Sequence, residues 1–450
     1  MPPEILIYTL TKNTKNVKLA YERKSKLKLS EMSASELRQA YQNFKKEYDE
    51  VCELGIDLDI SRGKPNGAQL DLSNGLMTCL DKSVIDKCSF DYRNYGVMEG
   101  VPSSRKMLAP LLGVDYENTL VCGNSSLNIM YDCIVRAMLL GVLEGKTPWS
   151  QLPKVKFLCP APGYDRHFAI CEEFGIEMIT IDMTPTGPDM DTVERLVAED
   201  DTIKGMWCVP KYSNPQGITY SDETVRRLAS MKTAADDFRI FWDNAYCIHD
   251  LYDEGDELLN VLDACTEAGN PDRVYIFFST SKISFAGSGV AAMGGSKNNI
   301  DWQKKRMTIQ TISFDKINQL RHVIYYKDAD GLKEHMKMHA DILRPKFETV
   351  LKAFDEQLAP LGCVYYPRPR GGYFISLDVM DGCAKRVVEL CKNAGVVLTP
   401  AGSTYPYKKD PNDRNIRVAP SYINVDELEA AVSVLCASVK LACVEKLLEK

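Results

Sequence analysis

Residues 274–289 of this 450-residue chain read VYIFFSTSKISFAGSG. The opening run is apolar and aromatic, which is typical of a short strand buried on both faces of a sheet. Hydroxyl side chains, one lysine and several small residues follow it directly. Because α/β folds bind ligands at the carboxyl ends of their strands, the pattern places Lys282 at a ligand site. A lysine amine can form a Schiff base with a carbonyl, although the same pattern also fits a solvated loop lysine.

Short apolar runs of this kind recur along the middle of the chain and alternate with amphipathic segments such as Leu127–Leu140 and Asp222–Thr233. Strands that are apolar throughout and are separated by helices predict a mostly parallel sheet covered on both faces. Together with Val274–Ser279, this sheet should have seven strands in an α/β fold. The other six expected strands are Thr119–Cys122, Val155–Cys159, Ile176–Ile181, Ile203–Val209, Arg239–Trp242 and Gly289–Gly294.

The length of the chain favours two domains, because one hydrophobic core rarely extends over 450 residues. We expect an N-terminal tail at residues 1–30 and a large α/β domain at residues 76–325. Residues 31–75 and 326–450 should together form a smaller α+β domain.

Local signals indicate the elements of this smaller domain. Ser33 begins a capping-box pattern that predicts a helix, and Asn424 begins another before the last helix. Leu332–Leu358 has the spacing of a helix, and Arg370–Asp378 has the character of a strand. The stretch Ile60–Asn74 is rich in Gly, Asn and Pro, so we expect it to be irregular.

Composition and charge argue against several classes of protein. A net charge of −7 and a pI of about 5.5 disfavour nucleic-acid binding, which needs a basic face. The 15 cysteines form no framework and histidine is scarce, so we expect no metal site, no disulfide scaffold and a reducing, cytoplasmic location. No apolar run is long enough to predict a membrane span. The basic stretch Lys12–Lys28 is expected to be a solvated tail, with a transit peptide as the alternative.

Asp243 ends the apolar run Ile240–Trp242, and an acid at the end of a buried strand is costly without a charged partner. A protonated pyridine nitrogen, as in pyridoxal 5'-phosphate (PLP), is such a partner. The alternative is an aspartate that caps the next element. Tyr246, three residues later, can reach the 3'-oxygen of that cofactor or can be a packed core tyrosine.

Three further segments carry polar groups that suit a ligand. The residues Gly123–Ser126 follow the first expected strand and open a helix, which suits an anion as well as simple N-capping. Asn214 lies in a turn after another strand and can also point at a ring oxygen. Arg417 lies in an apolar, strand-like context and suits a substrate carboxylate or a structural salt bridge.

In this order the residues resemble the fold-type I PLP enzymes, and among these the class I aminotransferases, over roughly residues 58–450. The resemblance implies that Lys282 is the Schiff-base lysine and that Asp243 binds the pyridine nitrogen. It also implies that the 3'-oxygen is bound by Asn214 and Tyr246. The remaining implied site residues are the stacking Tyr164, the phosphate-binding Tyr95 lent across a dimer, the phosphate-cup residues Gly123, Asn124, Ser125, Ser126, Ser279 and Ser281, and the substrate-binding Gly63 and Arg417.

The stretch Gly63-Lys64-Pro65, with the Ser281-Lys282-Ile283 segment, is most similar to the bacterial subgroup called class Ic aspartate aminotransferases. One departure concerns the phosphate. Many class I members carry an arginine shortly after the lysine, whereas residues 283–296 contain neither Arg nor Lys. The phosphate would then depend on the helix terminus, the serines and Tyr95, or on a base from elsewhere.

The resemblance implies a homodimeric enzyme that moves an amino group from aspartate to 2-oxoglutarate by a ping-pong mechanism. Lys282, Asp243 and Tyr246 would be its catalytic residues. Another amino donor or another PLP reaction, such as β-elimination, would use the same residues. A PLP-binding transcription regulator, which needs a basic DNA-binding domain, and a non-catalytic scaffold are further alternatives. A second substrate carboxylate needs a second cation, for which the candidates are Arg62, Arg166, Arg368 and Arg370.

Overall fold

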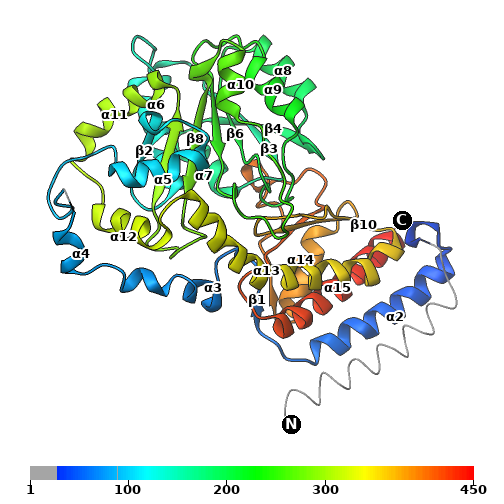
Figure 1. Ribbon diagram of the computed structural model, residues 1–450. Coiled ribbons are helices and arrows are strands. Elements are labelled where there is room, and N and C mark those ends of the chain that lie inside the picture. Colours follow the sequence, from blue (N-terminus) through cyan, green and yellow to red (C-terminus); the bar gives the residue numbers. More distant parts are fainter. Residues whose placement is uncertain (1–27, 89, 450) are drawn as a thin grey trace.

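The computed structural model describes residues 28–88 and 90–449 (Figure 1). Almost all of the predicted tail, and of the basic stretch Lys12–Lys28, therefore lies outside the described residues. Within the described ranges, no helix is both long and apolar enough to cross a membrane.

The centre of the molecule is a sheet with the strand order β2-β9-β8-β7-β6-β3-β4-β5. The strands from β8 to β4 in this order are parallel, whereas β9 is antiparallel to both of its neighbours and β5 is antiparallel to β4. The seven predicted strands and the mostly parallel sheet are confirmed. The additional strand is β5, which the sequence did not indicate because it has two residues and no apolar run. The bounds are β2 Thr119–Val121, β3 Lys156–Ala161, β4 Glu177–Thr184, β5 Gly187–Pro188, β6 Ile203–Cys208, β7 Arg239–Asp243, β8 Val274–Ser279 and β9 Ala291–Gly295.

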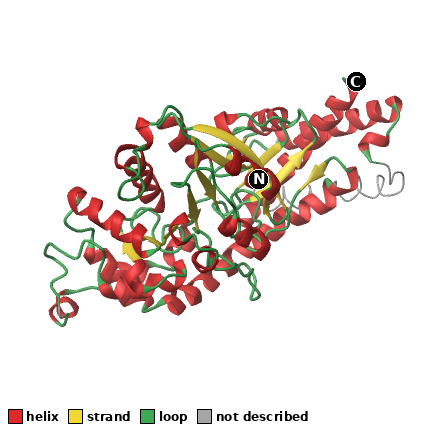
Figure 2. Ribbon diagram, turned by 90° about the horizontal axis from the view of Figure 1, so that it is seen from above, coloured by secondary structure: helices red, strands yellow, loops and turns green. Residues whose placement is uncertain are grey.

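Helices cover both faces of this sheet, as the two views in Figures 1 and 2 show. Successive strand residues point to opposite faces, so Ile240 and Trp242 join one hydrophobic cluster while Phe241 joins the other. One face packs on α5 Pro102–Leu112, α8 Met190–Glu199, α9 Asp222–Ser230 and α10 Val261–Glu267. The other face packs on α6 Ser126–Leu140, α7 Asp165–Glu173 and α11 Lys297–Gln310. Burial on both faces explains why these strands are apolar throughout.

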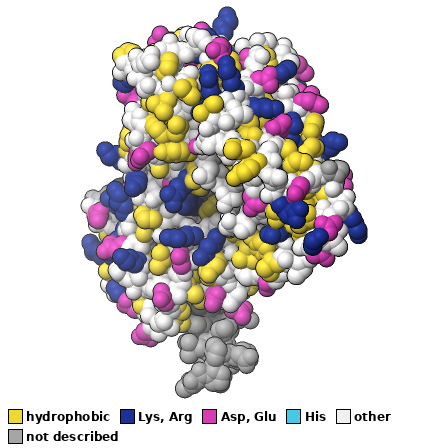
Figure 3. Space-filling view, turned by 90° about the vertical axis from the view of Figure 1, so that its left-hand side faces the viewer, with side chains coloured by type: hydrophobic (Ala, Val, Ile, Leu, Met, Phe, Trp, Pro, Cys, Tyr) yellow, Lys and Arg dark blue, Asp and Glu magenta, His cyan; other side chains and the backbone are white. Residues whose placement is uncertain are grey.

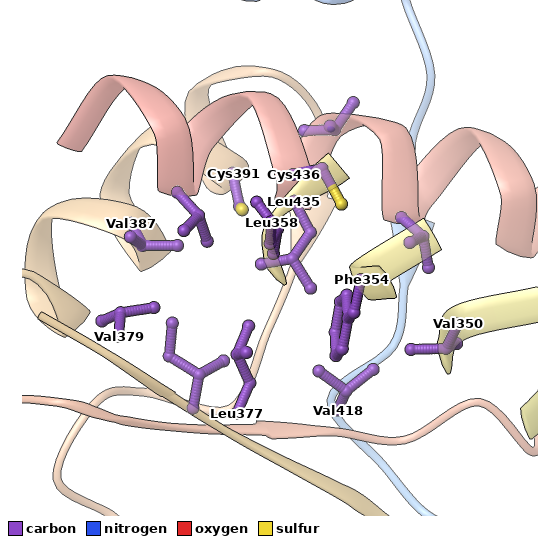
Figure 4. Packing of buried hydrophobic residues seen from close by; sticks show 14 of the residues in the cluster. Val350, Phe354, Leu358, Leu377, Val379, Val387, Cys391, Val418, Leu435 and Cys436 are labelled. Atoms are coloured by element: carbon purple, nitrogen blue, oxygen red, sulfur yellow. The ribbon is translucent and has the colours of Figure 1, made fainter. Parts of the chain in front are cut away.

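A second unit contains an antiparallel sheet, β10-β11-β13, and a parallel pair, β1-β12. Its core is shown in Figure 4, where Phe354 and Leu358 lie between the final helix and the sheet residues Leu377 and Val418. The strands are β1 Leu58–Asp59, β10 Val364–Tyr365, β11 Ile375–Val379, β12 Val396–Val397 and β13 Asn415–Val418. The helices are α2 Ala34–Cys52, α13 Ala329–Gln357, α14 Ala384–Asn393 and α15 Val425–Leu448, while α3 Gly67–Asp71, α4 Lys82–Asp86 and α12 Lys316–Tyr326 lie along the connections.

The capping boxes predicted at Ser33 and Asn424 are both present. Two expectations for this part of the chain need correction. The stretch Ile60–Asn74 is not wholly irregular, because Asn66 caps the short helix α3. The predicted strand Arg370–Asp378 begins only at Ile375, because Gly371 is pressed against the Tyr212 ring, which a Cβ atom would approach to 2.2 Å.

Candidate active site

The polar residues predicted at the strand ends lie along one edge of the large sheet. Lys282 follows β8, Asp243 ends β7, Asn214 follows β6 and Tyr164 follows β3. Gly123 follows β2 with a φ of +60°, a conformation that favours glycine, and so turns the chain into α6. The sheet order β2-β9-β8-β7-β6-β3 therefore brings five segments that are far apart in sequence to a common edge.

Asp243 is the most constrained of these groups. It is 4% exposed, and its Oδ2 lies 3.2 Å from Nε2 of His167, which stacks on Trp207 with ring centres 4.4 Å apart. Its Oδ1 is buried and has no hydrogen-bond partner among the described residues. Asp243 also accepts no backbone N–H there, so it does not cap an element. A buried carboxylate oxygen without a donor is costly, so this side chain is built to meet a further hydrogen-bond donor.

Lys282 lies next to Tyr246, with its Nζ 5.0 Å from the centre of the phenol ring. No hydrogen bond or ion pair joins this Nζ to another of the described residues. Burial, and secondarily Asp243, raises the pKa of Tyr246, so its hydroxyl is protonated at neutral pH. Burial also raises the pKa of Tyr164 to about 12, and its ring lies edge-on to His167. The site thus presents a lysine side chain without a polar partner in the described chain, beside two neutral phenols.

Arg417 reaches this region from β13 and is almost fully buried. Its Nη1 lies 3.1 Å from Oδ1 of Asp165 and 3.5 Å from Oδ1 of Asn214. Its Nε and Nη2 donate to Oγ1 of Thr399 at 3.4 and 3.3 Å, and the guanidinium covers the Phe374 ring at 4.9 Å. The salt-bridge alternative for Arg417 is therefore present in the structure, next to the residues of the candidate site.

The hydroxyl groups expected to bind an anion lie around the start of α6. Ser125 is the N-cap residue of this helix, yet its side chain makes no capping hydrogen bond, and Ser126 is the first helical residue. Ser281 donates to the carbonyl oxygen of Asn124 at 3.0 Å, and Ser279 donates to Ser281 at 3.2 Å. Within the described chain, no lysine or arginine is hydrogen-bonded to these serines. The N–H groups in the first turn of α6, which have no partner within the helix, therefore provide the positive charge of the expected anion site.

The other residues predicted from the sequence are Gly63, Tyr95 and the four arginines considered as a second cation. Gly63 is packed against Phe374, and a Cβ atom there would lie 2.4 Å from the ring. Tyr95 is 76% exposed, so its ring is not buried in its own chain. Of the candidate second cations, Arg368 pairs with Asp355 and Arg370 pairs with Asp256, while Arg62 and Arg166 are exposed.

A buried polar network supports the segment that carries Lys282. The Tyr373 hydroxyl donates to the carbonyl oxygen of Lys282 at 3.2 Å. Gln69 donates to the Tyr373 hydroxyl at 2.8 Å and lies 3.1 Å from Nδ1 of His339, whose Nε2 lies 3.2 Å from Nε2 of His335. Burial lowers the pKa of His335 and lowers that of His339 to about 4. Both rings are therefore neutral at pH 7 and help to position the lysine segment.

In the sequence, histidine stood out only because it is scarce, yet all five histidines of the chain lie around this site. Besides His335 and His339, His322 lies 3.1 Å from Oγ1 of Thr280, and the ring of His249 lies edge-on to Tyr246. His167 contacts Asp243, as described above. His322 and His167 contact residues 42 and 76 positions away, so no local pattern revealed those contacts.

Comparison with known proteins places the chain in a family. The profile described as aspartate amino-transferase matches residues 32–450. The chain belongs to this family. An aspartate aminotransferase of Corynebacterium glutamicum is 44% identical over 422 residues, which cover 94% of this chain and 98% of that protein.

Solved structures agree with this assignment. The crystal structure of an aspartate transaminase from Corynebacterium glutamicum, 44% identical, has a TM-score of 0.91 and covers 94% of this chain and 100% of that one. LysN, an α-aminoadipate aminotransferase from Thermus thermophilus, is 19% identical with a TM-score of 0.70, over 87% of this chain and 93% of its own, and shares the fold. The predicted resemblance is confirmed, and the chain is an aminotransferase; the alternatives of a different amino donor or another PLP reaction such as β-elimination are not favoured.

The buried histidines predict a pH dependence of stability. An unfolded His339 binds a proton below its ordinary pKa of about 6.5, whereas the folded one does not until about pH 4. The unfolded state therefore binds more protons between these values, and the free energy of unfolding falls as pH is lowered through this range. Replacing His339 with Gln should remove about 2 kcal/mol of the stability loss between about pH 7.5 and pH 5.

The measurement is urea unfolding of the wild type and His339→Gln at both pH values. Met338→Gln, a change of a half-exposed neighbour on α13, serves as the control and should keep the wild-type pH dependence. Equal pH dependence in His339→Gln and the wild type would contradict a neutral, buried His339.

Proposed function

We propose that this aminotransferase binds PLP above Asp243 and transfers the amino group of L-aspartate to 2-oxoglutarate by a ping-pong mechanism. The observation that carries the proposal is the buried, unpaired Oδ1 of Asp243, whose carboxylate lies near Tyr246, as does the Nζ of Lys282. A protonated pyridine nitrogen would supply the donor and the positive charge that this oxygen lacks. The names of the relative and of the solved structure from Corynebacterium glutamicum, aspartate aminotransferase and aspartate transaminase, support the choice of substrate.

The other residues of the pocket fit the same cofactor. Tyr164 offers a ring at the correct edge of the sheet, and Tyr246 offers a neutral hydroxyl for the 3'-oxygen. Ser125 and Ser126 at the start of α6, with Ser281 nearby, offer donors for a phosphate. The LysN structure, which shares the fold, holds N-(5'-phosphopyridoxyl)-L-leucine, and this supports a pyridoxyl cofactor here.

When bound, PLP supplies a carbonyl carbon for the amino group and a ring that accepts electrons from the substrate Cα. Lys282 would hold the cofactor at rest and, once the substrate amine has displaced it, would take the proton from Cα and return it to C4' of the cofactor. Asp243 keeps the proton on the ring nitrogen, and His167 orients Asp243. Arg417 binds the α-carboxylate, which fixes the Cα–H bond relative to Lys282.

We also propose that the active enzyme is a homodimer whose sites are shared. Tyr95 is highly exposed, as are the apolar side chains of Met77, Ile309 and Ile312. These belong to the flank of Figure 1 that carries α4, α11 and α12, and Figure 3 shows apolar side chains exposed on that flank among Lys and Arg side chains. Exposed apolar patches are typical of protein interfaces, and Tyr95 would reach the phosphate of the neighbouring subunit.

We also propose the domain boundaries of the chain and its location in the cell. Hydrophobic clusters that draw mostly on different parts of the chain support a large domain at residues 76–325 and a small domain made of residues 31–75 and 326–450. The clusters cross these boundaries in places, since Leu332 and Met336 pack with the large domain and Tyr212 packs with the small one. All 15 cysteines are free thiols, which supports a reducing, cytoplasmic location.

A half-reaction tests the proposed activity. L-Aspartate alone should bleach the visible absorption band of the cofactor-loaded protein and release one oxaloacetate per site, and L-glutamate should do the same. Lys282→Ala should bind the amino acid but release oxaloacetate at least about 10²-fold more slowly, because it lacks the proton-transferring amine. Lys46→Ala, a change of an exposed lysine on α2, away from the proposed interface, should behave as the wild type.

Bleaching by alanine or aromatic amino acids without bleaching by aspartate or glutamate would contradict the dicarboxylate substrate. Wild-type turnover in Lys282→Ala would contradict the catalytic role of that lysine.

The shared site predicts complementation between two inactive variants, Lys282→Ala and Tyr95→Ala. When both are unfolded and refolded together, random pairing makes about half of the dimers hybrid, and one of the two sites in each hybrid has both residues intact. Roughly a quarter of all sites should then recover activity. If mass analysis shows hybrid dimers but activity stays at the level of the separate variants, Tyr95 does not act across the dimer.

A further inference from the structure

The hydrogen bonds of Arg417 leave too few donors for a substrate carboxylate. A guanidinium has five N–H groups, and a carboxylate is held bidentately by two parallel ones on one edge. Nε and Nη2 both point at Oγ1 of Thr399, which covers the first such edge. The second edge needs one N–H of Nη1, and the two there are directed at Asp165 and Asn214.

A carboxylate that binds the second edge must therefore replace one of the two partners of Nη1. Asn214 is 3% exposed and has no room to turn into solvent. The Asp165 side chain is 37% exposed, whereas that of Arg417 is 10% exposed, so only the aspartate can swing away into water. Two carboxylates on one guanidinium also repel each other, which favours the departure of Asp165.

Asp165 also has a function while the site is empty of substrate. A buried guanidinium without a counter-charge is strongly destabilising, and Asp165 supplies that charge. It does so across two parts of the fold, because it is the first residue of α7 on the large sheet, while Arg417 lies in β13 of the three-stranded sheet. The ion pair thus joins the two sheets until a ligand replaces it.

From these contacts we propose that Asp165 is an internal stand-in for the substrate α-carboxylate, which the substrate must displace from Arg417. The inference rests on the proposed role of Arg417 in carboxylate binding. Asp165 then sets specificity and affinity, because every ligand that binds Arg417 must first break the Asp165–Arg417 ion pair. A ligand without a carboxylate cannot replace Asp165 on Arg417. The ion pair therefore discriminates against simple amines.

Two measurements on an Asp165 variant distinguish a side chain that the substrate displaces from one that only supports Arg417. They are the dissociation constant of a dicarboxylate and the melting temperature, and the direction in which each changes decides between the two roles. Asp165→Asn should lower the dissociation constant of succinate, an unreactive dicarboxylate, by about tenfold, which corresponds to about 1.4 kcal/mol. The same variant should lower the melting temperature of the ligand-free holoenzyme, because the buried guanidinium loses its counter-charge. A residue that merely supported Arg417 would change both quantities in the unfavourable direction.

Succinate binding is measured by calorimetry on the PLP-loaded protein, together with the KM for L-aspartate. Glu173→Gln, which removes the same charge from an exposed position on α7, is the matched control and should leave both values unchanged. Asp165→Ala provides a second variant in case Asp165→Asn folds poorly. A succinate dissociation constant that is unchanged or higher in the Asp165 variants would overturn the proposal.

Arg417→Lys distinguishes failure of this inference from failure of the proposed function. If Arg417→Lys weakens succinate binding but Asp165→Asn does not strengthen it, Arg417 keeps its role and the displacement of Asp165 is wrong. If Arg417→Lys leaves succinate binding unchanged, Arg417 does not bind the carboxylate, and both proposals fail.

Discussion

The site depends on one constrained group, the carboxylate of Asp243 at the end of a strand in the middle of the sheet. Neighbouring strands and helices on both faces remove it from water, and His167 meets only one of its oxygens. Such a carboxylate needs a further donor, and the free amine of Lys282 and the open start of α6 lie on the same sheet edge. The need of this one oxygen of Asp243 for a hydrogen-bond donor thus connects the buried central strand to the chemistry proposed for the site.

The pocket draws on both sheets. The large sheet provides Lys282 and Asp243, while Arg417 comes from the three-stranded sheet and His339 from the long helix α13. Contacts between these parts, such as the Tyr373 hydroxyl on the Lys282 carbonyl, fix the lysine relative to the arginine. Stereochemical control of proton transfer at Cα requires such a fixed relation, because the bond to be broken must face the amine.

Much of the fold could be predicted from the sequence, because a strand buried on both faces must be apolar along its whole length. Seven strands were recognised in this way, and Lys282 and Asp243 stood out as charged residues at the ends of such strands. The two-residue strand β5 was missed because it is too short to show any pattern. The glycines that precede β11 were included in a strand because their close packing against the distant Tyr212 is not visible in sequence.

The residues that support the site could not be predicted from local sequence patterns either. His167, Asp165 and Thr399 act through partners between 18 and 252 residues away along the chain, so only the folded structure brings them together. The surplus of arginines was a weaker signal than it appeared. Arg368 and Arg370 already have acidic partners of their own in the structure.

The protonation state of the cofactor's pyridine nitrogen tests the central claim most directly, by nitrogen-15 NMR on protein loaded with labelled PLP. We predict a protonated nitrogen at neutral pH in the wild type. In Asp243→Asn, which keeps the shape of the side chain but removes its charge, the proton should be lost. An unprotonated nitrogen in the wild type, or a proton that persists in Asp243→Asn, would contradict the claim that Asp243 holds the cofactor ring.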